Sequence, residues 1–205
     1  MRLEECKLFR NSRIDLSKIE ILEFPSNFTI EIEDDESKYV GIVLEGKIHV
    51  KAYSLAGKDF TINTLDPGHL FGDVLIFGST EKTFPGSLIT KGKTKIAIIP
   101  NNEFEQYLFY DNDFLKNFLE MLSDKAFEMN IKSKLLSQDS VRDKILFYLY
   151  QQRRIQKSKV IELNMTKEEL ANQLYMQRPS LSRELIKMKE DGLIDYDRWT
   201  ITLNK

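Results

Sequence analysis

Residues 165–194 read MTKEELANQLYMQRPSLSRELIKMKEDGLI, and this stretch contains two helices with clear start and stop signals. Thr166 and Glu169 form a capping box, in which each side chain accepts the backbone N–H of the other residue. The second helix ends at Gly192, because glycine readily takes the left-handed conformation that follows a helix. The apolar residues expected to face inward are Leu170, Ala171 and Leu174 in the first helix, and Leu181, Leu185, Ile186 and Met188 in the second. Two such helices joined by a short turn predict a helix-turn-helix.

The second helix carries a polar face that is suited to reading DNA. Arg178 and Arg183 can each bind O6 and N7 of a guanine through two hydrogen bonds. Pro179 is tolerated near the first turn, because the amide hydrogen that it lacks has no helical partner there. A solvated polar face without a function is the plain alternative. The other polar candidates, which suit base edges or phosphates, are Gln177, Ser180, Ser182 and Lys187.

The flanking residues complete a winged helix-turn-helix over residues 140–205. Ser140 can cap a preceding helix, residues 159–163 read as a short strand, and residues 193–203 read as a terminal hairpin. Residues 141–205 hold 13 Lys and Arg against 9 Asp and Glu, whereas residues 1–140 hold 17 against 23. The C-terminal residues are therefore basic and the rest of the chain is acidic, which indicates a polyanionic partner for the C-terminal part. Together with the helix-turn-helix, this charge predicts that the partner is double-stranded DNA.

A long helix is expected over residues 113–139, and its pattern predicts a homodimer. Between Asp113 and Gln138 there is no Gly or Pro, and apolar residues recur at alternating steps of four and three. Such spacing is typical of a heptad seam between two helices. A neighbouring stripe would pack on the N-terminal domain, and burial of the whole helix in its own chain is the alternative. The seam residues are Leu115, Leu119, Leu122, Ala126, Met129 and Leu136.

Residues 1–112 predict an antiparallel β-domain. Eight of the nine glycines lie between Gly41 and Gly92, among short segments rich in β-favouring residues. Turn-forming pairs such as Glu45–Gly46 are expected to separate these strands. Many short strands at this spacing are typical of a sandwich or barrel, so the whole chain is assigned to the α+β class. The expected strands are residues 19–24, 28–32, 39–44, 47–53, 60–65 and 94–99.

The helix-turn-helix stretch resembles that of the CRP/FNR-type bacterial transcription regulators, the group of the cyclic-AMP receptor protein. The order of domains is similar, and Gly46 and the segment Pro67–Asp73 resemble the β-roll motifs of that family. The resemblance implies that residues 1–112 form a β-roll, which is a double-stranded β-helix of the cyclic-nucleotide-binding type. It also implies that residues 113–139 form the dimerisation helix and residues 140–205 the DNA-binding domain.

The resemblance also assigns roles within the helix-turn-helix. Arg178 and Arg183 would fall on base-reading positions, and Thr166 would contact a phosphate. Two departures from the family pattern stand out: Tyr175 occupies the inter-helix turn where Gly is usual, and Gln177 replaces the commoner Ser at the second helix start. Pro179 stands where many members have Glu, which predicts a different base preference, and Ser182 lies beside the base-reading positions.

The effector site implied by the resemblance is incomplete. Cyclic-nucleotide members bind the phosphate through an Arg followed by Ser or Thr, whereas the corresponding stretch here, residues 81–87, contains no arginine. Lysine lacks the planar fork that holds a phosphate through two hydrogen bonds, so cyclic AMP is disfavoured. The candidate effector-binding residues are Gly72, Asp73, Val74, Lys82, Thr83, Met129 and Asn130.

Composition excludes one cofactor and disfavours another. A single cysteine, Cys6, excludes an iron–sulfur cluster held by four cysteines of one chain, and its acidic neighbours disfavour a redox switch. Haem ligation would have to use His49 or His69, which ordinary strand and turn roles explain better. No metal site is expected. The sequence has no apolar run long enough for a membrane helix and no apolar signal-peptide core, so we expect a cytoplasmic protein.

Together these features predict a homodimeric regulator, not an enzyme, that binds a near-palindromic DNA site and contacts RNA polymerase. A small effector in the β-roll is expected to control DNA affinity. One alternative is a cupin-like metalloenzyme, which clustered histidines would favour and which His49 and His69, on separate segments, do not. Another is a nucleotide-sensing module that acts on a partner protein through its helical tail. The sequence does not identify the effector or the target genes, or whether the protein activates or represses them.

Overall fold

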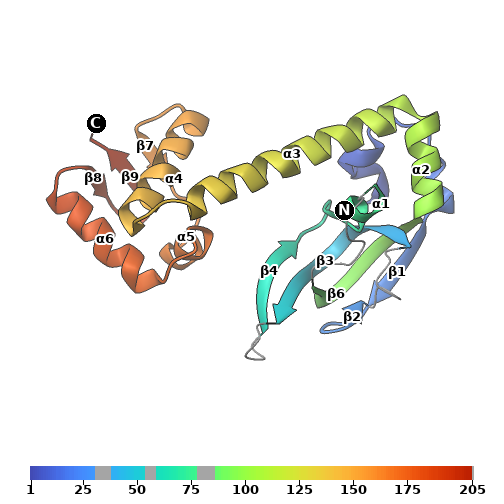
Figure 1. The fold of residues 1–205 in the computed structure, drawn as a ribbon, viewed down its shortest axis with the longest axis horizontal. Helices are drawn as coiled ribbons and strands as arrows, with labels where there is room; N and C mark the ends of the chain where they lie inside the picture. The colour runs from blue at the N-terminus through green and yellow to red at the C-terminus, as the bar shows by residue number, and fades with distance from the viewer. Residues whose placement is uncertain (31–37, 54–58, 78–85, 205) are drawn as a thin grey trace. The chain divides into compact units, whose positions relative to one another are not determined.

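The computed structural model describes residues 1–30, 38–53, 59–77 and 86–204 (Figure 1). The chain divides into two compact units, Met1–Ser123 and Asp124–Lys205. Helix α3, Asn112–Leu136, contributes residues to both units. The division therefore falls inside the helix that the sequence marks as a separate dimerisation element.

The N-terminal unit is built on an antiparallel sheet with the strand order β1-β6-β3-β4. The expected strand break at Glu45–Gly46 is wrong: residues on both sides belong to one long strand, with irregular pairing to β6 at this point. Gly46 has a φ of +76°, and an added Cβ would lie 2.5 Å from the carbonyl oxygen of Lys93. The glycine thus makes a bulge instead of a turn. The strands are β1 Glu20–Phe24, β2 Thr29–Ile30, β3 Tyr39–Tyr53, β4 Asp59–Leu65, β5 Leu70–Phe71 and β6 Ser87–Pro100.

Helices close one side of this unit. Helix α2, Asn101–Tyr110, is not among the predicted elements. A single residue separates it from α3. Its Phe104 packs edge-to-face on Phe114 and Phe118 of α3, with ring centroids 5.2 Å apart in both pairs. All three rings are buried in one apolar cluster with Val40, Ile42 and Ile99 of the sheet. The short helices are α1 Asp73–Ile76 and the 3₁₀ turns Leu3–Glu5, Lys7–Phe9 and Leu16–Lys18.

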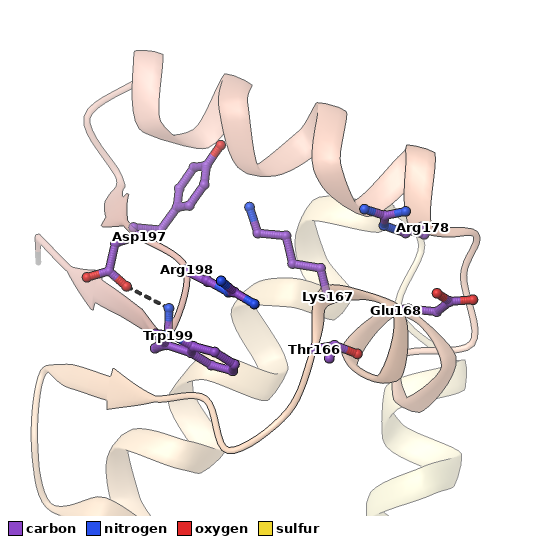
Figure 2. Close-up of a pocket in the computed structure, with 8 residues that line it drawn as sticks. Thr166, Lys167, Glu168, Arg178, Asp197, Arg198 and Trp199 are labelled. Atoms are coloured by element: carbon purple, nitrogen blue, oxygen red, sulfur yellow. Dashed lines mark hydrogen bonds between the residues drawn. The ribbon is translucent and has the colours of Figure 1, made fainter.

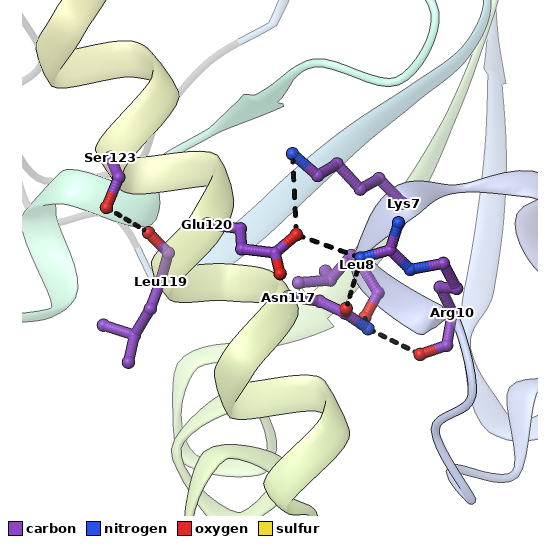
Figure 3. A network of polar contacts seen from close by, with 7 residues as sticks. All are labelled: Lys7, Leu8, Arg10, Asn117, Leu119, Glu120 and Ser123. Atoms are coloured by element: carbon purple, nitrogen blue, oxygen red, sulfur yellow. Dashed lines mark hydrogen bonds and ion pairs between the residues drawn. The ribbon is translucent and has the colours of Figure 1, made fainter.

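Polar contacts fix the first half of α3 on the N-terminal segment (Figure 3). The buried Asn117 side chain donates to the backbone carbonyls of Leu8 at 3.1 Å and Arg10 at 2.7 Å. The guanidinium of Arg10 lies 3.0 Å from the Glu120 carboxylate. This part of α3 therefore belongs to the N-terminal unit by both apolar packing and hydrogen bonds.

The C-terminal unit confirms the predicted winged helix-turn-helix. Ser140 caps α4 by accepting the Asp143 N–H at 3.1 Å. The apolar cluster includes all but one of the expected inner residues of both motif helices, and also Leu135 from α3. Ile186, which was expected to face inward, is 49% exposed, because Leu181, Leu185 and Met188 already form the buried stripe. The elements are α4 Val141–Gln156, β7 Val160–Glu162, α5 Lys167–Gln173, α6 Arg178–Glu190, β8 Ile194–Tyr196 and β9 Thr200–Leu203.

The predicted seam residues of α3 fall into two groups. Leu115 and Leu122 pack against the apolar cluster of the N-terminal unit, so they contribute to the core of their own chain. The other four seam residues are exposed, namely Leu119, Ala126, Met129 and Leu136. In the part of the chain that the structure describes, no helix combines the length and the hydropathy needed to span a membrane.

Candidate nucleic-acid interface

Helix α5 begins with the predicted capping box, and the hydrogen bonds of this box engage the Thr166 side chain. The hydroxyl of Thr166 accepts the Glu169 N–H at 3.2 Å and donates to the Glu169 carboxylate at 2.9 Å. The same carboxylate accepts the Thr166 N–H at 2.7 Å. The Thr166 N–H and hydroxyl lower the pKa of Glu169, so the carboxylate is charged at neutral pH. Both hydrogen-bond donors of Thr166, the residue expected on a phosphate, are therefore engaged within the helix start.

The turn between α5 and α6 contains Tyr175, which has a φ of +54°. This is the left-handed region, where a non-glycine residue costs roughly 1–2 kcal/mol. The ammonium of Lys132, from the last turns of α3, lies 5.1 Å from the centre of the Tyr175 ring. A cation over an aromatic face offsets part of that cost, by about 0.5–1 kcal/mol at an exposed site. The tyrosine thus replaces the usual glycine with a side chain that contacts α3.

Helix α6 begins differently, because no side chain caps it. Gln177 holds the N-cap position without a side-chain hydrogen bond to the helix, and Pro179 lies in the first turn. Both are exposed, as are Arg178 and Lys187, whereas Ser180 and Ser182 are half-buried. Arg183 is exposed and its Nε donates to the Pro179 carbonyl at 3.2 Å. The polar groups at the start of this helix are therefore available to a ligand.

Charge pairing distinguishes this surface from the contact between α4 and α6. Arg142 of α4 lies 2.6 Å from Glu184 and 2.7 Å from Asp191, which ties α4 to α6. By contrast, within the described residues the cations along the exposed face of α6 form no ion pair with a carboxylate. They are Arg178, Arg183 and Lys187.

A hollow of about 580 Å³ opens between the wing hairpin and the starts of α5 and α6 (Figure 2). Lys167 of α5, Arg178 of α6 and Arg198 of the wing turn line it, together with the rings of Tyr196 and Trp199. Arg178 belongs both to this hollow and to the predicted recognition surface. No role was predicted for the other four residues; the Asp197–Arg198 junction of the predicted hairpin is a local signal for Tyr196, Arg198 and Trp199, but none points to Lys167.

The candidate effector residues are distributed over both units. Gly72, with a φ of +79°, precedes α1, where Asp73 is buried and Val74 is half exposed. Met129 and Asn130 are exposed on the part of α3 that belongs to the C-terminal unit. The remaining two candidates, Lys82 and Thr83, lie outside the described residues.

The residues considered for haem or redox chemistry have ordinary structural surroundings. His49 lies on β3, and burial, together with the nearby lysines, lowers its pKa, so its imidazole is neutral at pH 7. His69 accepts the Asp66 N–H at 3.1 Å within a turn. Cys6 is buried, and burial raises the pKa of its thiol. Among the residues with described positions, no three His, Cys, Asp or Glu side chains gather as metal ligands.

Two family models match the chain in the order of the two units. Residues 21–111 match the cyclic nucleotide-binding domain, and residues 143–205 match the Crp-like helix-turn-helix domain. The chain is 21% identical over 192 residues to the cyclic AMP receptor protein of Thermus thermophilus, covering 89% of this chain and 82% of that protein.

Solved structures show the same fold. A CooA variant from Carboxydothermus hydrogenoformans matches with a TM-score of 0.64 at 17% identity, covering 99% of this chain and 91% of that one. The catabolite activator protein of Thermus thermophilus matches with a TM-score of 0.54 at 20% identity, covering 96% and 93%. An OCPA complex of CprK has a TM-score of 0.66 at 13% identity, covering 96% and 91%.

Proposed function

Because the chain belongs to the CRP/FNR family of transcription regulators, with a cyclic nucleotide-binding-type domain and a Crp-like helix-turn-helix, we propose that it binds a near-palindromic DNA operator as a homodimer. Two recognition helices in a dimer bind half-sites about one helical turn of DNA apart, which gives the operator its symmetry. The protein would work in the cytoplasm, and regulation would involve RNA polymerase.

The observation that carries this proposal is the unpaired positive charge on α6. Arg178, Arg183 and Lys187 are exposed, and none of them is neutralised by a described carboxylate. DNA phosphates and guanine edges are the partners that such side chains bind best. The Gln177 side chain makes no capping hydrogen bond, so the start of α6 offers both charged and neutral hydrogen-bond donors to base edges.

The dimer would use the exposed seam residues of α3. Leu119, Met129 and Leu136 are 52%, 65% and 47% exposed, and Ala126 is exposed with them. Pairing with the same residues of a second copy would remove this apolar surface from water. Leu115 and Leu122 would take a smaller part, because they already pack on their own chain.

We leave the effector open within the proposal. An effector in the N-terminal unit would shift the population of two dimer arrangements and thereby change DNA affinity. The candidate residues around Gly72 and Asp73 provide a buried carboxylate, but residues 81–87 contain no arginine for a cyclic phosphate. Binding measured with and without cyclic AMP, with haem and with a cell extract would separate these cases.

The test is selection of duplexes from a random pool by the purified, ligand-free protein. We expect a two-fold symmetric motif among the retained sequences. Arg183→Ala should abolish preference for that motif in a competition assay while the dimer persists in sedimentation. Arg154→Ala, which removes an exposed arginine on α4, is the matched control and should retain the preference. Full sequence preference in Arg183→Ala would rule out α6 as the reading element.

A further inference from the structure

Arg142 of α4 holds α6 at two points. Its Nε lies 2.6 Å from a carboxylate oxygen of Glu184, and its Nη1 lies 2.7 Å from a carboxylate oxygen of Asp191. Glu184 and Asp191 are seven residues apart, which places them on one face of the helix, about 10 Å apart along its axis. Glu184 belongs to the middle of α6, whereas Asp191 is its C-cap. One guanidinium therefore joins the middle of α6 to its end.

The groups that make this contact are partly buried and come from a fixed backbone. The side chains of Arg142 and Glu184 are 35% and 16% exposed, so salt screens this pair less than it screens a surface pair. Ser140 caps the start of α4 by accepting the Asp143 N–H, which fixes the backbone from which Arg142 extends. Hydrogen bonds between an arginine and carboxylates also have a defined geometry. Arg142 thus gives α6 a directional contact in addition to its apolar packing.

Apolar packing alone defines the rotation of α6 about its axis less sharply, because the hydrophobic effect is non-directional. The buried stripe of the helix consists of Leu181, Leu185 and Met188. A rotation of about 20° moves a group that lies about 6 Å from a helix axis by about 2 Å, which is enough to break a hydrogen bond. Arg183 precedes Glu184 in the chain, so Arg142 holds the helix next to the side chain expected to read a base.

We infer that Arg142 is a positioning residue for sequence recognition, which fixes the rotation of α6 so that Arg183 meets the base edges in one orientation. This role rests on the DNA binding proposed above, and Arg142 acts through α6 without touching a base. Phosphate contacts carry no sequence information, whereas a base contact requires donor and acceptor to meet at hydrogen-bond distance. Loss of the Arg142 contact should therefore reduce the preference for the operator more than it reduces binding to random sequence.

The test replaces the ion pair by two apolar side chains. Arg142→Met/Glu184→Met leaves the net charge unchanged, and the exchange of a partly buried ion pair for apolar residues is often neutral or stabilising. We expect the affinity for the selected two-fold symmetric motif, relative to a random-sequence duplex, to fall about tenfold. Affinity for the random-sequence duplex should stay within about twofold, because that binding depends on charge. The urea midpoint of unfolding should not fall.

Two further variants complete the series. Arg154→Met/Glu190→Met removes the same charges from exposed positions on the same two helices, so it should retain the preference for the motif. Arg142→Lys keeps the positive charge but lacks the planar fork that reaches two carboxylates, so it should lose about threefold in relative affinity. This single variant also tests the inference if the double methionine variant does not fold.

The outcomes separate a positioning role from a merely structural one. An equal loss of affinity for both duplexes, together with a lower urea midpoint, would mean that Arg142 only stabilises the fold, and the inference would be overturned. Unchanged relative affinity in Arg142→Met/Glu184→Met would overturn it as well, although the proposed function would stand. If the unsubstituted protein itself prefers no motif, the proposed function fails and the positioning role fails with it.

Discussion

Helices α5 and α6 begin in opposite ways, although they are neighbours in one motif. Thr166 at the start of α5 engages its hydroxyl and its N–H with Glu169 of the same helix. Gln177 at the start of α6 makes no such bond, and Arg178 after it has no carboxylate partner among the described residues. Helix α5 thus uses the polar groups at its start for folding, whereas Gln177 and Arg178 make no such contacts among the described residues.

The largest effect should follow a charge reversal at the start of α6. Arg178→Glu removes a cation from both the recognition surface and the hollow, so we expect DNA affinity to fall on the order of a hundredfold or more. The free energy of unfolding should change by less than about 0.5 kcal/mol, because the residue is exposed. Mobility shift and urea unfolding measure the two quantities.

Lys93→Glu is the control for net charge. Lys93 pairs with Glu23 at 2.7 Å on the sheet of the N-terminal unit, and its replacement makes the same change in total charge. We expect the DNA affinity of this variant to stay within about twofold of the unchanged protein, since an exposed charge away from the recognition surface contributes little. An equal loss in both variants would mean that total charge, and not the start of α6, determines binding.

A smaller effect, on stability, should follow a substitution at the start of α5. Thr166→Ala removes the capping hydroxyl, and we expect the C-terminal unit to lose about 1 kcal/mol of unfolding free energy. Thr166→Ser should recover most of it. Gln177→Ala should cost only a few tenths of a kcal/mol, because its side chain caps nothing. A larger loss at Gln177 than at Thr166 in urea unfolding would reverse the comparison.

The smallest effect should appear in acid. The pKa of Glu169 is lowered in the folded state, so its stabilisation is complete above the unfolded pKa of about 4.3 and is lost as pH falls through the lower folded value. We follow urea unfolding of the C-terminal unit by Trp199 fluorescence. We expect the urea concentration at the midpoint to decrease once the pH is below about 4. Glu169→Gln should flatten this dependence in part, because Asp197 also has a lowered pKa. An identical pH dependence in the variant would exclude the capping carboxylate as a cause.

The contrast between the two helix starts also shows what a sequence can reveal. Thr166 and Glu169 are three residues apart, so their capping box is a local signal, and the structure confirms it. The bulge at Gly46 depends on the Lys93 carbonyl of another strand, which no local pattern contains. The hollow likewise combines Lys167 with Arg198, which tertiary folding brings together. Local hydrogen bonds were predictable, whereas pairing between distant segments was not.

The contributions of α3 to the C-terminal unit define what can be transplanted. Leu135 is buried in the core of that unit, and Lys132 covers the ring of Tyr175 in the helix-turn-helix turn. A graft that begins at Ser140, where the composition changes, would leave a hole in the core and expose a strained turn. A chimaera that carries this helix-turn-helix on another sensor domain should therefore retain the part of α3 from Asp124 onward.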